Sequence, residues 1–208
     1  LADTANEHVV LAGAFERHGY YTSTEVSPLE RHYYKHNLKN GKKVKITKEH
    51  GTHNVLPSAS GKYFLDNYSS TDVARNVDIA DAKGNFVKRL HEAVDPLKDY
   101  NIGTIELGEL KAEDGQTLYT RMIMPYNFDE NKKYPVIIYV YGGPHAQMIT
   151  DEWTAGAGIY LHYLSQEGFI VFTLDNRGSA DRGEAFEQVI HRQCGQAEMR
   201  DQKVGIDY

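Results

Sequence analysis

The fold of the chain can be inferred from one segment, Tyr134-Pro135-Val136-Ile137-Ile138-Tyr139-Val140-Tyr141-Gly142-Gly143-Pro144-His145. From Val136 to Tyr141 every residue is apolar or aromatic, without alternation, and the run ends at two glycines and a proline. A run of strand length bounded by turn residues predicts a strand buried on both faces of a parallel sheet. Open α/β sheets place their chemistry at the carboxyl ends of such strands, so a functional site is expected where this run ends.

Tyr141 stands at that carboxyl end, directly before two glycines. In a functional interpretation its hydroxyl group donates a hydrogen bond to the oxyanion of an acyl-transfer intermediate, an interaction worth about 3 to 4 kcal/mol. In the alternative interpretation Tyr141 is the last aromatic residue of a tyrosine-rich strand. The pair Gly142-Gly143 supports the first, because the loop after the third strand supplies oxyanion donors in hydrolases of this architecture.

The residues after this strand predict a βαβ unit. Apolar residues recur with helical spacing over residues 152–166, and Gly168 is placed to end that helix. A second continuous apolar run, Phe169–Leu174, predicts a parallel neighbouring strand reached by a right-handed crossover. A hairpin is predicted around Asp114-Gly115, and a further helix begins near Ala197.

The first part of the chain reads as short β-strands separated by glycine turns, with the strands expected at Tyr20–Glu25, Arg31–Leu38, Lys42–Thr47, Tyr63–Tyr68, Val77–Ala80 and Phe86–Leu90. Their spacing fits hairpins of four-stranded propeller blades, and it fits a sandwich meander equally well. We therefore expect residues 1–90 to form one all-β domain, residues 91–103 a linker, and residues 104–208 an α/β domain.

Composition excludes several classes of protein. The 208 residues are 40% apolar and carry a formal net charge of −6 without a long basic run, which argues against disorder and against nucleic acid as a partner. No apolar run reaches membrane-spanning length, and no signal-peptide pattern is present at the first residues. The single cysteine, Cys194, excludes an internal disulfide and leaves the compartment open.

Ser179 and Asp175 are two further candidates for a catalytic role. A nucleophile elbow requires Gly-x-Ser-x-Gly, and Ser179 lacks the second glycine, so we interpret it as a turn or N-cap serine. No other serine in the chain meets that pattern. Asp175 lies at the carboxyl end of a predicted strand, as a triad carboxylate would, but a structural ion pair with Arg177 or Arg182 is the favoured interpretation.

The histidines give no metal-binding pattern. His32 and His36 are four residues apart, but their segment reads as a strand rather than a helix. His50 and His53 are expected in a turn, His145 beside the proposed site, and His191 on a predicted helix. Surface or structural roles are expected for them, with His145 close enough to Tyr141 to touch a substrate. No metal or other cofactor is predicted.

Several motifs together resemble one enzyme family. They are Tyr134-Pro135 through Pro144, Leu174-Asp175-Asn176-Arg177-Gly178-Ser179, Ala185-Phe186-Glu187-Gln188-Val189-Ile190-His191-Arg192, Gly195-Gln196-Ala197-Glu198-Met199, Asp201-Gln202 and Thr24-Glu25-x-Ser27-Pro28-Leu29-Glu30-Arg31-His32. From about Gly19 onward the chain resembles the dipeptidyl peptidase IV branch of the prolyl oligopeptidase serine peptidases, which includes bacterial prolyl tripeptidyl aminopeptidases. The resemblance implies a β-propeller fragment followed by the N-terminal half of an α/β-hydrolase domain, truncated before the nucleophile elbow.

The resemblance also implies a function. Tyr141 takes the oxyanion-hole role, while the nucleophile, aspartate and histidine of the triad lie outside the chain, so the fragment alone is expected to be inactive. The substrates would be peptides with proline near the N-terminus, cleaved by a homodimer in a periplasmic or extracellular location. The alternatives are an acylaminoacyl-peptidase or esterase of the same fold, or a propeller–hydrolase protein that only binds its ligand.

A physical consequence follows from the strand order of that fold, in which the third strand lies between the fourth and the fifth. Without the fifth, the strand Pro135–Tyr141 becomes an apolar, unpaired sheet edge of the kind that aggregates. We therefore expect the chain to need the missing C-terminal part of the hydrolase domain, or a partner strand, to be stable.

Overall fold

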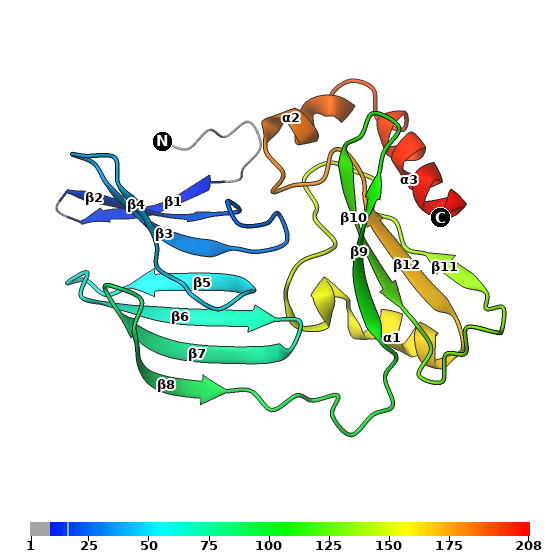
Figure 1. The fold of residues 1–208 in the computed structure, drawn as a ribbon, viewed down its shortest axis with the longest axis horizontal. Coiled ribbons are helices and arrows are strands. Elements are labelled where there is room, and N and C mark those ends of the chain that lie inside the picture. Colours follow the sequence, from blue (N-terminus) through cyan, green and yellow to red (C-terminus); the bar gives the residue numbers. More distant parts are fainter. Residues whose placement is uncertain (1–8, 16) are drawn as a thin grey trace. The chain divides into compact units, whose positions relative to one another are not determined.

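The structure, a computed structural model, describes residues 9–15 and 17–208 (Figure 1). These residues form two compact units. The first contains the described chain up to Val94 together with the short segment Thr150–Trp153, and the second contains Asp95–Ile149 and Thr154–Tyr208. The domain limits expected at residues 90 and 104 stay predictions.

The first unit consists of two four-stranded antiparallel sheets. Each follows chain order, as consecutive hairpins dictate. The strands of one sheet are β1 (Val9–Phe15), β2 (His18–Ser23), β3 (His32–Asn37) and β4 (Lys43–Lys45). Those of the other are β5 (Thr52–Pro57), β6 (Tyr63–Ser70), β7 (Val73–Asp81) and β8 (Phe86–Glu92). A four-stranded antiparallel sheet of this kind is the repeating blade of a β-propeller, so the unit corresponds to two blades.

Aromatic side chains join the two sheets. Tyr20 of β2, Tyr33 of β3 and Phe64 of β6 are all buried, and the Phe64 ring centre lies 5.7 Å from that of Tyr20 and 5.3 Å from that of Tyr33. Tilted and edge-on rings at these separations add electrostatic attraction to the burial of their large apolar area. The tyrosine-rich composition therefore builds the core of this unit.

All six strands predicted in this part are present, with ends shifted by a few residues. Two strands were not predicted, β1 and β5. In β5 the polar residues His53 and Asn54 and the terminal Pro57 weaken the strand signal, and His53 was placed in a turn. Hydrogen bonding of β5 to β6 along its whole length overrides that local preference.

The second unit is built on one mixed sheet with the order β11-β12-β10-β9. Its strands are β9 (Ile105–Lys111), β10 (Thr117–Ile123), β11 (Val136–Ile138) and β12 (Ile170–Asp175). The predicted hairpin pairs β9 with β10, and β11 runs parallel to β12, as the βαβ prediction requires. The helical elements are η1 (Trp153–Gly156), α1 (Ile159–Gln166), α2 (Glu184–Glu187), η2 (Gln188–Ile190) and α3 (Ala197–Asp207).

Helix α1 is shorter than the sequence predicts. The backbone of Thr154 and Ala155 is left-handed, with φ of 62° and 52°, and this breaks the helical periodicity before Ile159. Its end agrees with the prediction, since Gly168 has a φ of 91° and its amide donates to the Ser165 carbonyl oxygen.

The strand that ends at Tyr141 differs most from its prediction. It was expected to be buried on both faces, but β11 covers only three residues and Val136, Tyr139 and Val140 are exposed by 54%, 41% and 46%. Among the described strands β11 pairs with β12 alone and forms the sheet edge, which agrees with the predicted strand order. The apolar run would suit a strand covered on both faces, but the described part of the chain leaves Val136, Tyr139 and Val140 exposed.

The two units together give the predicted fold, a β-propeller fragment followed by the N-terminal half of an α/β-hydrolase domain. The sheet order places the carboxyl ends of the parallel strands β11 and β12 side by side (Figure 1). The segments that follow those two ends carry the candidate site.

Candidate functional site

Tyr141 lies just beyond β11, and its side chain is 58% exposed. Its ring lies over the backbone of Gly143, because a Cβ atom there would be 3.1 Å from Cε1 of Tyr141. Gly142 has a φ of 70°, a conformation that residues with a Cβ rarely adopt. The two glycines thus allow the chain to turn beneath an accessible phenol group.

His145 holds the same loop against the end of β12. Its backbone is left-handed, with a φ of 63°, and its amide donates to the Gly178 carbonyl oxygen at 3.2 Å. The imidazole is 81% exposed, with Nδ1 lying 3.7 Å from a carboxylate oxygen of Glu187. The side chain is therefore accessible, and its contact with a substrate stays a prediction.

Asp175, the last residue of β12, is buried and binds this loop through its carboxylate. Its oxygens accept hydrogen bonds from the amides of Met148, at 2.9 Å and 3.2 Å, and of Ile149, at 3.0 Å. Burial raises the pKa of Asp175 to about 6, although the two amides act in the opposite direction. The predicted ion pair with Arg177 or Arg182 is wrong, because backbone amides occupy the carboxylate instead.

Arg121 is a site residue that sequence reasoning missed. It lies in the middle of β10, fully buried, and donates to the carbonyl oxygens of Met148 and Ala155, both at 2.7 Å, and to Oγ1 of Thr173 at 3.1 Å. Its desolvated position lowers the pKa of Arg121 to about 10, so it stays charged at neutral pH. A single charged residue in the middle of a strand whose other residues are all uncharged was the available signal.

The turn after β12 is fixed by α3. Arg177 forms a bidentate pair with the buried Asp201, which also accepts the Arg177 amide, and it contacts Asp114 of the β9–β10 hairpin. Ser179 is a turn serine, as predicted, since its hydroxyl donates to the Asn176 carbonyl oxygen at 2.7 Å. Its Oγ is therefore engaged in the turn rather than poised as a nucleophile.

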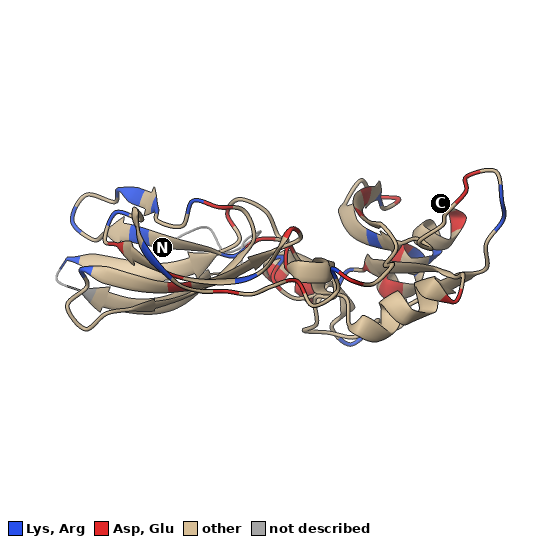
Figure 2. Ribbon diagram, turned by 90° about the horizontal axis from the view of Figure 1, so that it is seen from below, with Lys and Arg blue, Asp and Glu red and all other residues tan. Residues whose placement is uncertain are grey.

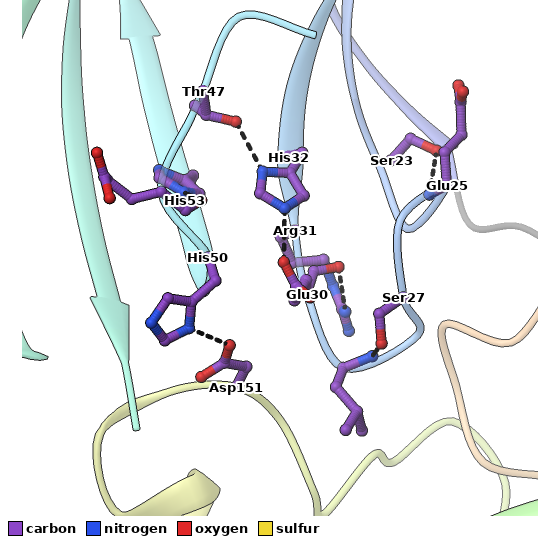
Figure 3. Close-up of polar contacts among 12 residues, drawn as sticks. Ser23, Glu25, Ser27, Glu30, Arg31, His32, Thr47, His50, His53 and Asp151 are labelled. Carbon is purple, nitrogen blue, oxygen red and sulfur yellow. Dashed lines mark hydrogen bonds and ion pairs between the residues drawn. The ribbon is translucent and has the colours of Figure 1, made fainter. Parts of the chain in front are cut away.

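His32 and His53 lie within strands of the first unit, close to polar side chains (Figure 3). His32 is buried in β3 between Thr47 and Glu30, at 2.9 Å and 2.7 Å, and burial lowers its pKa. His53 lies in β5 rather than in the predicted turn, and its Nδ1 lies 2.9 Å from a carboxylate oxygen of Asp66. His36 belongs to β3 and is half-buried.

His50 and His191 are two of the histidines that lie outside strands. His50 bonds Asp151 at 2.8 Å, and this hydrogen bond raises the pKa of His50. Asp151 belongs to the segment of later sequence that packs with the first unit, and its other oxygen accepts the Thr71 amide. His191 was expected on a helix, but it follows the short 3₁₀ helix η2 as its capping residue.

Charge and hydropathy add little to the site. Acidic and basic positions are interspersed along the described ribbon (Figure 2). Over residues 9–15 and 17–208, no three His, Cys, Asp or Glu side chains come close enough together to bind a metal ion. None of the helices in this part of the chain combines the length and apolar character required to cross a bilayer.

Comparison with known proteins identifies the family. The model of the dipeptidyl peptidase IV N-terminal region matches residues 13–75, and that of the prolyl oligopeptidase family matches residues 158–208. The crystal structure of a candidate dipeptidyl aminopeptidase IV from Bacteroides ovatus is 37% identical, with a TM-score of 0.90 over 97% of this chain and 29% of that chain. The chain belongs to the dipeptidyl peptidase IV branch of the prolyl oligopeptidase family.

Three other members of the branch are also similar to this chain. Porphyromonas gingivalis dipeptidyl peptidase 4 is 29% identical, with a TM-score of 0.88 over 97% of this chain and 29% of that chain. Mouse dipeptidyl peptidase 8 is 29% identical over 91% of this chain, and Trichophyton rubrum dipeptidyl peptidase 4 is 28% identical over 88% of it. The chain spans 22% of the length of the first of these two relatives and 24% of that of the second.

Proposed function

We propose that the complete protein containing this chain is a serine exopeptidase that releases N-terminal Xaa-Pro dipeptides, or tripeptides, through an acyl-enzyme. Its substrates are peptides with proline near the N-terminus, and it acts as a homodimer. The single observation that supports an active site here is the position of Tyr141, an accessible phenol at the carboxyl end of a parallel strand in a dipeptidyl peptidase fold.

The chemistry assigns one step to this chain. When a serine attacks the carbonyl carbon of the proline residue, the carbonyl oxygen becomes an oxyanion and requires hydrogen-bond donors. The Tyr141 hydroxyl donates to that oxyanion, and the same bond forms again when water attacks the acyl-enzyme. The chain contains no Gly-x-Ser-x-Gly sequence, so it supplies the oxyanion donor without a nucleophile and is inactive by itself.

Substrate preference of the complete protein tests this proposal. Three chromogenic substrates are compared: an H-Xaa-Pro amide and an N-acyl-amino-acid amide with the same arylamine leaving group, and a short-chain ester with the corresponding phenol as leaving group. Preference for the Xaa-Pro amide, with covalent labelling by an organophosphonate, is the expected result. Preference for the acylated amide or the ester would assign an acylaminoacyl-peptidase or an esterase, and no labelling with binding alone would assign a non-catalytic protein.

A further inference from the structure

The loop that follows Tyr141 is held at Met148 by hydrogen bonds to two buried charged side chains. The carbonyl oxygen of Met148 accepts a hydrogen bond from Nη1 of Arg121 at 2.7 Å, and the amide of Met148 donates one to the carboxylate of Asp175 at 2.9 Å. The next amide, that of Ile149, donates to the second oxygen of the same carboxylate at 3.0 Å. Both peptide planes that meet at Met148 are therefore fixed by buried charged groups.

The two charged residues are themselves held rigidly. Arg121 and Asp175 lie on the neighbouring strands β10 and β12, and their exposed fractions are 0% and 4%. Arg121 is further fixed by Ala155 and by Thr173, its partner in the strand register. Charged donors and acceptors make the stronger hydrogen bonds of proteins, and burial strengthens them further.

The same loop is also held at His145, whose amide donates to the Gly178 carbonyl oxygen in the turn after β12. The side chain of Tyr141 is mainly exposed and rests on Gly143, so the position of its hydroxyl depends on the course of the loop backbone.

We propose that Arg121 and Asp175 are positioning residues for the oxyanion donor: they clamp the backbone at Met148 and so set the loop that supports Tyr141. This inference rests on the proposed function of Tyr141. It predicts that loss of the clamp slows the chemical step while substrate binding is retained, because a misplaced catalytic group costs rate rather than affinity.

The experiment uses the complete protein with Asp175→Asn and, separately, Arg121→Met. Hydrogen–deuterium exchange of the Met148 and Ile149 amides is measured together with kcat and KM for the Xaa-Pro amide. We expect exchange at both amides to accelerate at least about tenfold, and kcat to fall about tenfold or more with KM changed less than about twofold. Asp175→Glu, which restores a carboxylate, should recover part of both effects.

A control separates positioning from general destabilisation. Asp78 of β7 is also a buried carboxylate, and it accepts from Arg89 at 2.9 Å and 3.0 Å in the first unit. Asp78→Asn should leave the exchange of the Met148 and Ile149 amides unchanged. If Arg121→Met does not fold, Asp175→Asn and Arg121→Lys test instead whether the two residues position the loop, because these substitutions preserve side-chain size better.

The outcomes separate the two proposals. Unchanged exchange at Met148 and Ile149 in folded Asp175→Asn would overturn the clamp. Faster exchange with an unchanged kcat would overturn its positioning role while leaving the peptidase assignment intact. A wild-type protein without peptidase activity would overturn the proposed function, and with it the role in catalysis, whereas the exchange measurement would still report on the clamp itself.

Discussion

Replacing Gly143 with alanine is expected to slow acylation while leaving the protein folded. The added methyl group would lie 3.1 Å from Cε1 and 3.6 Å from Cζ of Tyr141. Ordinary carbon contacts begin near 3.4 Å, so the ring must move by a few tenths of an ångström. Because the ring is 58% exposed, it can move into solvent, and we expect stability to change by less than about 0.5 kcal/mol.

The effect on rate follows from the geometry of the oxyanion bond. Complete loss of one oxyanion donor costs about 3 to 4 kcal/mol. A displacement of a few tenths of an ångström weakens that bond without abolishing it, so about 1 to 2 kcal/mol of transition-state stabilisation should be lost. That loss corresponds to acylation about 5- to 30-fold slower than in the wild type.

Stopped-flow acylation of the complete protein by an Xaa-Pro amide measures this effect. The matched control is Gly158→Ala, because no heavy atom lies within 4 Å of a Cβ at Gly158 and its φ is −68°. The control should acylate at the wild-type rate. If folded Gly143→Ala did so as well, the contact between Tyr141 and the loop backbone would be irrelevant to catalysis, and the reasoning would be refuted.

Three further predictions concern folding. The 208-residue chain expressed alone should self-associate through its edge strand β11, and Val136→Lys should reduce this association. A monodisperse monomer of the unmodified chain in light scattering would contradict this prediction. Burial lowers the pKa of His162, so the folded state binds fewer protons than the unfolded state and stability should fall as pH drops below about 6.5. Thermal melts of His162→Leu should lack this component, and a pH dependence equal to that of the wild type would exclude it. In Gly84→Ala the new Cβ would lie 2.0 Å from the Ile46 carbonyl oxygen, whereas Gly115 has a similar φ and open space around it. In calorimetry the free energy of unfolding should therefore fall by about 1 to 3 kcal/mol more in Gly84→Ala than in Gly115→Ala. Equal losses in the two variants would contradict the close packing at Gly84.

Local sequence patterns predicted the elements whose environment is set by near neighbours. The hairpin at Asp114-Gly115 formed as expected, since Gly115 supplies the left-handed turn that joins β9 to β10. The parallel pairing of β11 with β12 followed from two apolar runs separated by a helix. Strand β5 escaped detection because its stability comes from pairing with β6, which no local pattern reports.

The candidate site was predicted only in part. Tyr141 and its glycines could be found because strand ends in α/β sheets concentrate chemistry. The roles of Asp175 and Arg121 could not be found, since each depends on a loop that is distant in sequence: the partners of Asp175 are 27 and 26 residues away, and Arg121 contacts Met148 across 27 residues. An ion pair with a nearby arginine was the simpler expectation, and backbone amides satisfied the carboxylate instead.

The central claim is that Tyr141 stabilises the oxyanion of acyl transfer in a dipeptidyl peptidase, and the acylation rate of Tyr141→Phe in the complete protein tests it most directly. Tyr139→Phe is the matched control, because Tyr139 lies two residues earlier and is also exposed. We predict that acylation by an Xaa-Pro amide slows about a hundredfold or more in Tyr141→Phe, and less than about twofold in Tyr139→Phe. Slowing of less than about tenfold in folded Tyr141→Phe would contradict the claim.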